Sequence, residues 1–373
     1  MRRCLTANLQ GPMINEAQSL VIDWTLGFGN GDLPMTPLRF RPLLKRIRWG
    51  GTRLGSVLGK PIGSESDYAE SWELCDHGSD QSVVDGGLWN GLTLRQLMGQ
   101  HVRELCGTER RLRQFPLLVK FLDASDRLSV QVHPNDVQAR FFNPHENGKT
   151  EAWVILDARP DSRLYAGLKR GVDAFRLQQH LSAGTVEECL HSYPVRAGDC
   201  IFIPAGTVHA IGEGILLAEV QQSSDLTFRL HDWDRLGADG QPRPLHIEES
   251  LACIDFDRGP VDPVVPRRLN LVSEELVASE FFTLHRHTLR DSWHAASDGR
   301  FHALLVLGGC GNLTCDDTEH SLQTGSTLLL PATCPPVIVE PRGELILLEV
   351  FLHPAGVRQP RLKRELTCFS RWS

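Results

Sequence analysis

The stretch GDCIFIPAGTVH, residues 198–209, has the pattern G-x5-P-x-G-x-x-H, and the fold of this 373-residue chain can be predicted from it. Its apolar run, Cys200–Ile203, has the length of a short buried strand. The segment Pro204-Ala205-Gly206 predicts a tight turn that a β-carbon on the glycine would obstruct. His209 follows this turn and ends the motif.

The same spacing recurs 127 residues later, where residues 325–336 read GSTLLLPATCPP. The first glycine and the first proline keep their places, whereas Thr333 stands at the second glycine and Pro336 at the histidine. Proline has no side-chain group that could bind a metal ion. The repeat therefore predicts two related domains, of which only the first keeps this ligand.

The first copy resembles the second conserved motif of the cupins, which are small double-sheet jelly rolls. This resemblance implies a mainly β chain of two cupin-type jelly-roll barrels with a few added helices. We predict a metal-binding catalytic domain with helical additions over residues 35–258 and a degenerate second cupin domain without metal ligands over 259–373. Residues 1–34 end in a turn-rich stretch, and we interpret them as a disordered extension or as sequence upstream of the natural start.

Hydrophobic periodicity supports this division of the chain. Thr93 is a candidate N-cap for a helix that ends at Gly107. The pattern of residues 247–254 is compatible with a helix, and residues 171–190 hold two short helical patterns. Strands are predicted over residues 117–122, 128–133, 151–156, 200–203, 215–221, 226–231 and, at about ten-residue spacing, across 275–360.

The composition excludes several classes of protein. Hydrophobic residues at 41% and charged residues at 23% are typical of a globular chain, and no apolar stretch approaches the ~18 residues of a membrane span. The net charge of −7 argues against binding to nucleic acid. Ten scattered cysteines without a C-x-x-C pair predict reduced thiols and a cytoplasmic protein, so any metal site must use histidine and carboxylate ligands.

Four residues are candidate metal ligands. Gln131 and His133 lie two apart on a predicted strand, so they share one face. Glu151 follows after 18 residues, enough for a loop and a return strand, and His209 ends the turn described above. Two imidazoles, one carboxylate and one amide oxygen suit zinc or a similar divalent ion. The alternative is that each histidine is an ordinary buried polar residue, which is how we interpret His285, His287 and His294.

Charged residues on later strands could complete an active site. Glu219 and Gln221 share one face of a strand, and Arg229 shares another with Thr227 and His231. A buried arginine needs an anion, and a phosphate or an enediolate would serve. The alternative is a structural ion pair between Arg229 and a neighbouring carboxylate, for which Asp225 and Asp232 are the obvious partners.

Several long motifs, in order, resemble those of type I phosphomannose isomerases in their short bacterial form. They are WGG (49–51), ESWE (70–73), KFLDA (120–124), LSVQVHPND (128–136), KTEAW (149–153), IPAGTVHAIG (203–212), EVQQSSDLTFRL (219–230), DWDR (232–235) and RPLH (243–246). The resemblance implies one Zn²⁺ per chain, held by Gln131, His133, Glu151 and His209. It implies Arg229, Glu219 and Lys149 as catalytic residues.

The activity implied is the interconversion of mannose 6-phosphate and fructose 6-phosphate by proton transfer through an enediolate. Glu219 is favoured over Lys149 as the base, because a lysine would have to lose its proton near pH 7. The rival interpretations are a non-catalytic cupin that binds sugar phosphates, an isomerase of another phosphosugar, and an iron-dependent cupin oxygenase. The expected partner is a small phosphosugar; the oligomeric state is left open and is compatible with a monomer.

Overall fold

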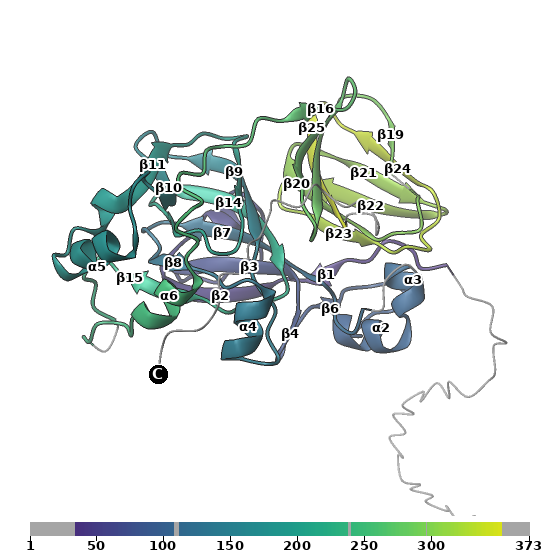
Figure 1. Cartoon of the computed structure of the whole chain (residues 1–373). Helices are drawn as coiled ribbons and strands as arrows, with labels where there is room; N and C mark the ends of the chain where they lie inside the picture. The colour runs from purple at the N-terminus through teal and green to yellow at the C-terminus, as the bar shows by residue number, and fades with distance from the viewer. Residues whose placement is uncertain (1–33, 108–111, 238–239, 296, 353–373) are drawn as a thin grey trace, which may run out of the picture. The chain divides into compact units, whose positions relative to one another are not determined.

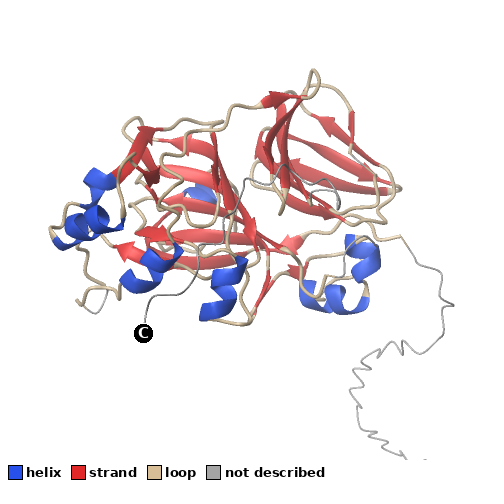
Figure 2. Ribbon diagram, in the orientation of Figure 1, coloured by secondary structure: helices blue, strands red, loops and turns tan. Residues whose placement is uncertain are grey.

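A computed structural model of the chain describes residues 34–107, 112–237, 240–295 and 297–352 (Figure 1). Strands dominate and the helices are short (Figure 2), which confirms the predicted mainly β class. None of the described helices has the length and hydropathy of a membrane-spanning segment. The extension predicted over residues 1–34 lies outside the described residues except for Pro34, and the predicted domain boundaries stay predictions.

The first barrel consists of two antiparallel sheets whose inner faces pack together. Leu122, Trp153 and Leu217 of one sheet share a buried core with Leu164 and Ile211 of the other. In spatial order, the six-stranded sheet contains β12 (Cys200–Ile203), β9 (Glu151–Ala158), β14 (Ile215–Gln222), β7 (Leu117–Ala124), β3 (Tyr68–Leu74) and β2 (Leu43–Gly51). The five-stranded sheet contains β11 (Leu190–Pro194), β10 (Arg163–Leu168), β13 (His209–Ile211), β8 (Val130–Val132) and β15 (Phe228–His231).

The second barrel repeats this plan with a smaller second sheet. Leu304 and Leu347 of its large sheet share a core with Leu313 and Val339 of its small one. The large sheet contains β16 (Arg267–Arg268), β17 (Ser273–Ala278), β18 (Thr283–Leu289), β25 (Leu345–Phe351), β20 (His302–Gly308) and β23 (Thr327–Leu330). The small sheet contains β19 (Trp293–His294), β24 (Val337–Pro341), β21 (Cys310–Cys315) and β22 (Thr318–Gln323).

The internal repeat predicted from the sequence is confirmed at the level of single residue pairs. The strand order β12-β9-β14-β7-β3 of the first barrel corresponds to β23-β20-β25-β18-β17 of the second. Ile203 pairs with Glu151, and Leu330, which lies 127 residues after Ile203, pairs with His302. The two large sheets can therefore be compared position by position.

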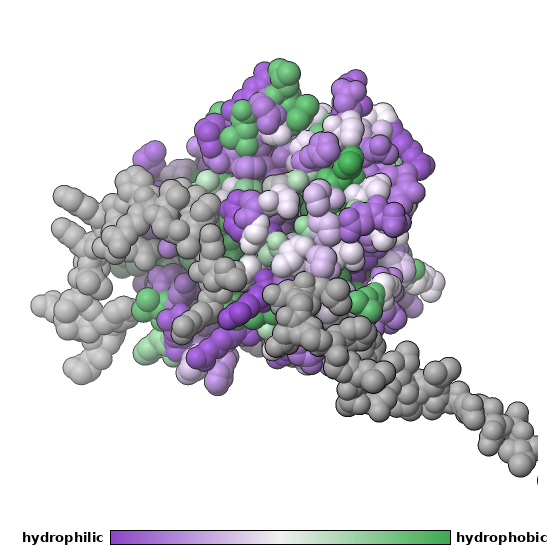
Figure 3. Space-filling view, turned by 90° about the vertical axis from the view of Figure 1, so that its right-hand side faces the viewer, coloured by the Kyte–Doolittle hydropathy of each residue, from purple (hydrophilic) through white to green (hydrophobic). Residues whose placement is uncertain are grey.

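The outer faces of the two large sheets belong to one hydrophobic core. Ala218 and Val220 of β14 belong to the same buried cluster as Leu348 and Val350 of β25. Arg286 of β18 adds a polar contact, because its guanidinium donates to the carbonyl oxygen of Gly198, the first residue of the motif that decides the fold. On the face drawn in Figure 3, by contrast, hydrophobic residues are interspersed with hydrophilic ones, as on most protein surfaces.

The helices and the remaining short strands surround the barrels. The predicted N-cap at Thr93 is confirmed, since its side chain forms a capping box with Gln96. The predicted continuous helix is wrong at His101, whose φ of −136° and ψ of 35° divide it into α2 and α3. The His101 ring packs edge-on against Trp89 at this break. The described helices are α1 (Arg53–Ser56), α2 (Leu94–Gln100), α3 (Val102–Cys106), α4 (Asp136–Phe142), α5 (Ala174–Ser182) and α6 (Ile247–Cys253), with a 3₁₀ turn at Val186–Cys189. Two further pairs of short strands are β1 (Phe40–Arg41) with β6 (Val83–Val84), and β4 (Asp76–His77) with β5 (Asp80–Gln81).

The turn at Gly206 fixes the approach to His209. Gly206 has a φ of +86°, and a β-carbon there would lie 3.1 Å from both the Asp255 β-carbon and the Cys253 carbonyl oxygen. Its N–H donates to the His133 carbonyl oxygen, and its own carbonyl accepts from the Asp255 N–H. One glycine thus holds together the two histidine-bearing segments and the end of α6.

Replacing Gly206 with alanine should therefore destabilise the chain. The positive φ alone should cost about 1–2 kcal/mol of unfolding free energy, and the contacts with Cys253 and Asp255 should add to it. Gly171→Ala is the matched control, because Gly171 has a φ of +80° and a β-carbon added there would meet no atom within 4 Å. If urea unfolding shows the same loss of unfolding free energy for both variants, the close packing at Gly206 contributes nothing to stability.

Candidate metal centre

Three of the four predicted ligands converge inside the first barrel. His133 directly follows β8, Glu151 begins β9 and His209 begins β13. The three side chains are almost completely buried, with relative exposures of 1%, 1% and 0%. The two histidines come from the five-stranded sheet and the glutamate from the six-stranded sheet, so the site forms only when the two inner faces pack together.

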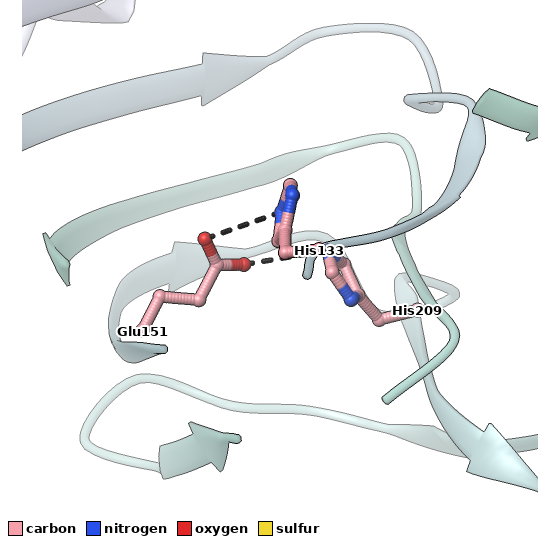
Figure 4. A group of neighbouring side chains, drawn as sticks. All are labelled: His133, Glu151 and His209. Atoms are coloured by element: carbon pink, nitrogen blue, oxygen red, sulfur yellow. Dashed lines mark ion pairs between the residues drawn. The ribbon is translucent and has the colours of Figure 1, made fainter. Parts of the chain in front are cut away.

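Glu151 faces both imidazoles, with one carboxylate oxygen toward each (Figure 4). Its Oε2 is 3.5 Å from His133 Nε2, and its Oε1 is 3.3 Å from His209 Nε2. Gln131, the fourth predicted ligand, pairs with His209 across β8 and β13, and its amide nitrogen Nε2 is 3.2 Å from His209 Nε2, whereas its amide oxygen is the atom that would bind a metal ion. All four candidates are therefore in one place.

Backbone carbonyl groups orient both imidazoles. His133 Nδ1 is 3.0 Å from the Leu226 carbonyl oxygen, and His209 Nδ1 is 2.9 Å from that of Thr207. Each Nδ1–H can donate there, which leaves the lone pair of each Nε2 directed at the site. This arrangement is typical of metal-binding histidines, whose second nitrogen is held by a backbone or carboxylate oxygen.

The polar atoms of this site fit a divalent cation. Both Glu151 oxygens and His133 Nε2 are buried without a hydrogen-bond partner among the described residues. Burial lowers the pKa of both histidines, that of His209 to about 4, so the imidazoles are neutral ligands. Without a cation, burial and the charge of Glu219 raise the pKa of Glu151 to about 8. A bound cation would satisfy these atoms and favour the ionised carboxylate.

A chain of buried charges continues from this site along the six-stranded sheet. Glu219 pairs in register with Lys120 on one side and Trp153 on the other. Its Oε1 is 3.3 Å from Lys120 Nζ, and its Oε2 accepts a 2.9 Å hydrogen bond from Trp153 Nε1. Burial opposes ionisation of Glu219, but Lys120 and Lys149 outweigh it and lower its pKa. Lys149 Nζ is 3.8 Å from Glu151 Oε2, so this predicted catalytic residue lies beside a ligand, and the charge of Glu219 is close enough to raise the pKa of Glu151.

Lys120 and Glu70 are site residues that the sequence analysis did not single out. Lys120 is 3% exposed in β7, and its Nζ lies 3.5 Å from Glu70 Oε2 as well as close to Glu219. A signal was available, because a lysine inside the apolar run LLVKFL requires carboxylate partners if the strand is buried. Nothing in the sequence says which carboxylates these are.

Arg229 lies beside the centre and forms no ion pair with Asp225 or Asp232, the partners considered for it in the structural alternative. It pairs in register with Gln131 across β15 and β8. Its Nη1 donates to the Pro244 carbonyl oxygen, and its buried Nε has no hydrogen-bond partner among the described residues. Asp232 instead pairs with the guanidinium groups of Arg235 and Arg243. The structural ion pair considered for Arg229 is therefore not formed in the described part of the chain.

Two cupin-type barrels, with one buried His-Glu-His centre in the first, define the class as a two-barrel cupin with a candidate metal site. Two family models match the chain: the catalytic domain of type I phosphomannose isomerase over residues 38–163, and the cupin domain of mannose-6-phosphate isomerase over 273–350.

Relatives match over most of their length. The chain is 37% identical to the mannose-6-phosphate isomerase of Streptococcus mutans over 300 residues, which cover 80% of this chain and 93% of the relative. It is 37% identical to mannose-6-phosphate isomerase ManA of Bacillus subtilis over 297 residues, which cover 79% and 93%. The crystal structure of the mannose 6-phosphate isomerase from Bacillus subtilis matches with a TM-score of 0.78 and 30% identity, over 85% of this chain and 99% of that one. The chain therefore belongs to the type I phosphomannose isomerase family.

Replacing His209 with alanine should remove the metal held at this centre. The variant should contain one equivalent of metal per chain less than the wild type, because a single imidazole with one carboxylate and one amide binds the ion much more weakly than two imidazoles do. His145→Ala is the control, since His145 is exposed and its backbone N–H bonds to Asn143 within its own turn. Elemental analysis of both purified variants makes the comparison, and unchanged metal content in His209→Ala would contradict the ligand assignment.

Proposed function

We propose that the chain is a zinc-dependent aldose–ketose isomerase that interconverts mannose 6-phosphate and fructose 6-phosphate. The observation that carries the proposal is the buried convergence of His133, Glu151 and His209 in a chain that belongs to the type I phosphomannose isomerase family. The neighbouring charges of Glu219 and Lys149 support a catalytic rather than a purely structural centre, since buried charges without a role are costly.

The four ligands would hold the zinc ion: Gln131, His133, Glu151 and His209. When bound, this ion supplies Lewis-acid chemistry to the carbonyl and hydroxyl oxygens of the sugar. Two neutral imidazoles and one carboxylate leave the ion and its ligands together with a net positive charge. An anionic substrate is favoured by this charge together with Lys149 and Arg229, although the whole chain carries −7.

Glu219 is the proposed base. Isomerisation removes a proton from the carbon next to the carbonyl and returns it to the neighbouring carbon. Glu219 is ionised near neutral pH, because Lys120 and Lys149 lower its pKa despite burial. Trp153 and Lys120 hold its two oxygens in place. Lys149, which lies beside Glu151, would stabilise the negative charge that develops on the enediolate oxygens.

Arg229 is the proposed anion-binding residue. Its unpartnered Nε and the lack of an ion pair to a described carboxylate leave its charge available for the phosphate or for the enediolate. Burial and the charge of Arg243 lower its pKa, which is the expected consequence of holding a guanidinium without a close carboxylate. Its position opposite Gln131 puts it next to the ligand set.

Metal removal should separate this proposal from a non-catalytic cupin that binds sugar phosphates. We expect the purified chain to isomerise mannose 6-phosphate, to lose this activity on treatment with a chelator and to regain it with Zn²⁺. A coupled assay that detects fructose 6-phosphate measures the turnover. Binding of mannose 6-phosphate with no turnover at full metal occupancy would support the non-catalytic interpretation, and turnover that needs Fe²⁺ and oxygen would support an oxygenase.

Arg229→Ala should lower kcat/KM for mannose 6-phosphate more than tenfold, a loss of transition-state stabilisation above ~1.4 kcal/mol. Its metal content should stay at the wild-type value, because Arg229 is not a ligand. Arg140→Ala on the exposed face of α4 serves as the control and should keep wild-type kinetics. Activity of Arg229→Ala within tenfold of the wild type means that this arginine is not central.

A cytoplasmic location and a small phosphosugar as the partner stay predictions. The eight cysteines that the structure describes are free thiols, and most of them are buried. Reduced thiols are typical of the cytoplasm, which supports the proposed location.

A further inference from the structure

The second barrel contains a histidine cluster that the function above does not use. His285 and His287 lie two apart in β18, and Glu349 lies in the adjacent strand β25. Glu349 Oε2 is 3.0 Å from His287 Nε2 and 3.8 Å from His285 Nδ1. One donor atom from each residue lies within 4.8 Å of the others, as in the group His133, Glu151 and His209.

The cluster occupies the same inner face of the sheet as the catalytic charges of the first barrel. Glu349 pairs with His285 and Leu304, whereas Glu219 pairs with Lys120 and Trp153 at the corresponding positions. A positively charged lysine is thus replaced by a neutral donor at His285. A protonated lysine cannot bind a metal ion. The first barrel therefore has an ion pair at these two positions, whereas the second barrel has two possible metal ligands.

Neighbouring side chains orient two of these three residues. Ser273 Oγ is 2.8 Å from His287 Nδ1, so the Nε2 of this ring faces Glu349. His302, which corresponds in register to Glu151, has its Nδ1 2.9 Å from Glu349 Oε1 and its Nε2 3.1 Å from Asp298. One carboxylate oxygen therefore faces His302 at ion-pair distance, while the other faces both histidines of the cluster. Such outer partners are typical of metal sites.

Glu349 differs from the two other carboxylates nearby in having no arginine partner among the described ion pairs. The two other nearby carboxylates are each paired with an arginine: Glu275 with Arg267 and Asp298 with Arg300. Glu349 has only histidine partners among the described ion pairs. His287 and Glu349 are buried, with exposures of 3% and 4%, whereas the His285 side chain is 20% exposed, so the cluster reaches solvent at this residue.

We propose that His285, His287 and Glu349 form a second site for a divalent transition metal of the zinc class, inside the second barrel. Two imidazole nitrogens and one carboxylate are an established donor set for zinc and for other first-row ions, with further positions open to water. The replacement of the motif histidine by Pro336 does not affect this site, because all three ligands come from β18 and β25. The inference stands whether or not the chain is an isomerase.

Metal stoichiometry tests the proposal on the full chain. After removal of metal by a chelator, Zn²⁺ is titrated against a competing indicator, and the bound metal is measured by elemental analysis. We expect two equivalents for the wild type and one for His285→Ala or His287→Gln. His294→Ala, which changes an exposed histidine of β19, should keep two. Binding of only one equivalent of Zn²⁺ by the wild type overturns the proposal, whether or not the variants fold. Binding of two equivalents by both His285→Ala and His287→Gln overturns it as well.

The His209→Ala background isolates the second site. There we expect one equivalent of Zn²⁺, a rise in Tm on adding Zn²⁺, and the loss of both effects in the double variant His209→Ala/His285→Ala. His285→Ala alone should keep wild-type isomerase activity with one equivalent bound. Abolition of all Zn²⁺ binding by His209→Ala alone would contradict a second site. A wild type that binds two equivalents of Zn²⁺ but does not isomerise mannose 6-phosphate would instead count against the proposed function only.

Discussion

The burial of Glu151 is the constraint on which the first barrel depends. A carboxylate that is 1% exposed, with no hydrogen bond to either oxygen among the described residues, is unfavourable unless a positive charge faces it. His133 and His209 cannot supply that charge, because their own burial keeps them neutral. Lys149 Nζ lies 3.8 Å from Glu151 Oε2, beyond hydrogen-bond distance, so a cation between the three side chains would compensate the carboxylate more closely. The backbone bonds to both imidazoles and the glycine turn before His209 are arrangements that keep the donor atoms directed at such an ion.

Much of this centre could be predicted from sequence because its ligands are close to turns and strand ends with recognisable spacing. His209 belongs to a motif of twelve residues, and the spacing of Gln131 and His133 is that of one strand face. The partners of Lys120 could not be predicted, since they depend on the register of β7 with β3 and β14. A strand register is set by tertiary packing rather than by local composition. The break at His101 was missed for a related reason, because a ring contact with Trp89 accompanies it.

The histidines of the second barrel illustrate the same limit. His285 and His287 look like ordinary strand residues, and Glu349 lies more than sixty positions away. Only the pairing of β18 with β25 brings them together. The loss of the motif histidine at Pro336 suggested a domain without ligands, but the same sheet position in the two barrels can hold different polar chemistry. The two barrels share the strand order and register of their large sheets, but the polar side chains on the inner faces of these sheets differ.

The contact of Arg286 with Gly198 has a consequence for how the chain can be divided. The boundary near residue 258 is a boundary in sequence, but the hydrophobic core on the outer faces of the two large sheets crosses it. A fragment that ends there would expose the apolar side of β14 to water and leave the Gly198 carbonyl without its guanidinium donor. We therefore expect the first barrel to depend on the second for its stability, and the two barrels to unfold as one cooperative unit.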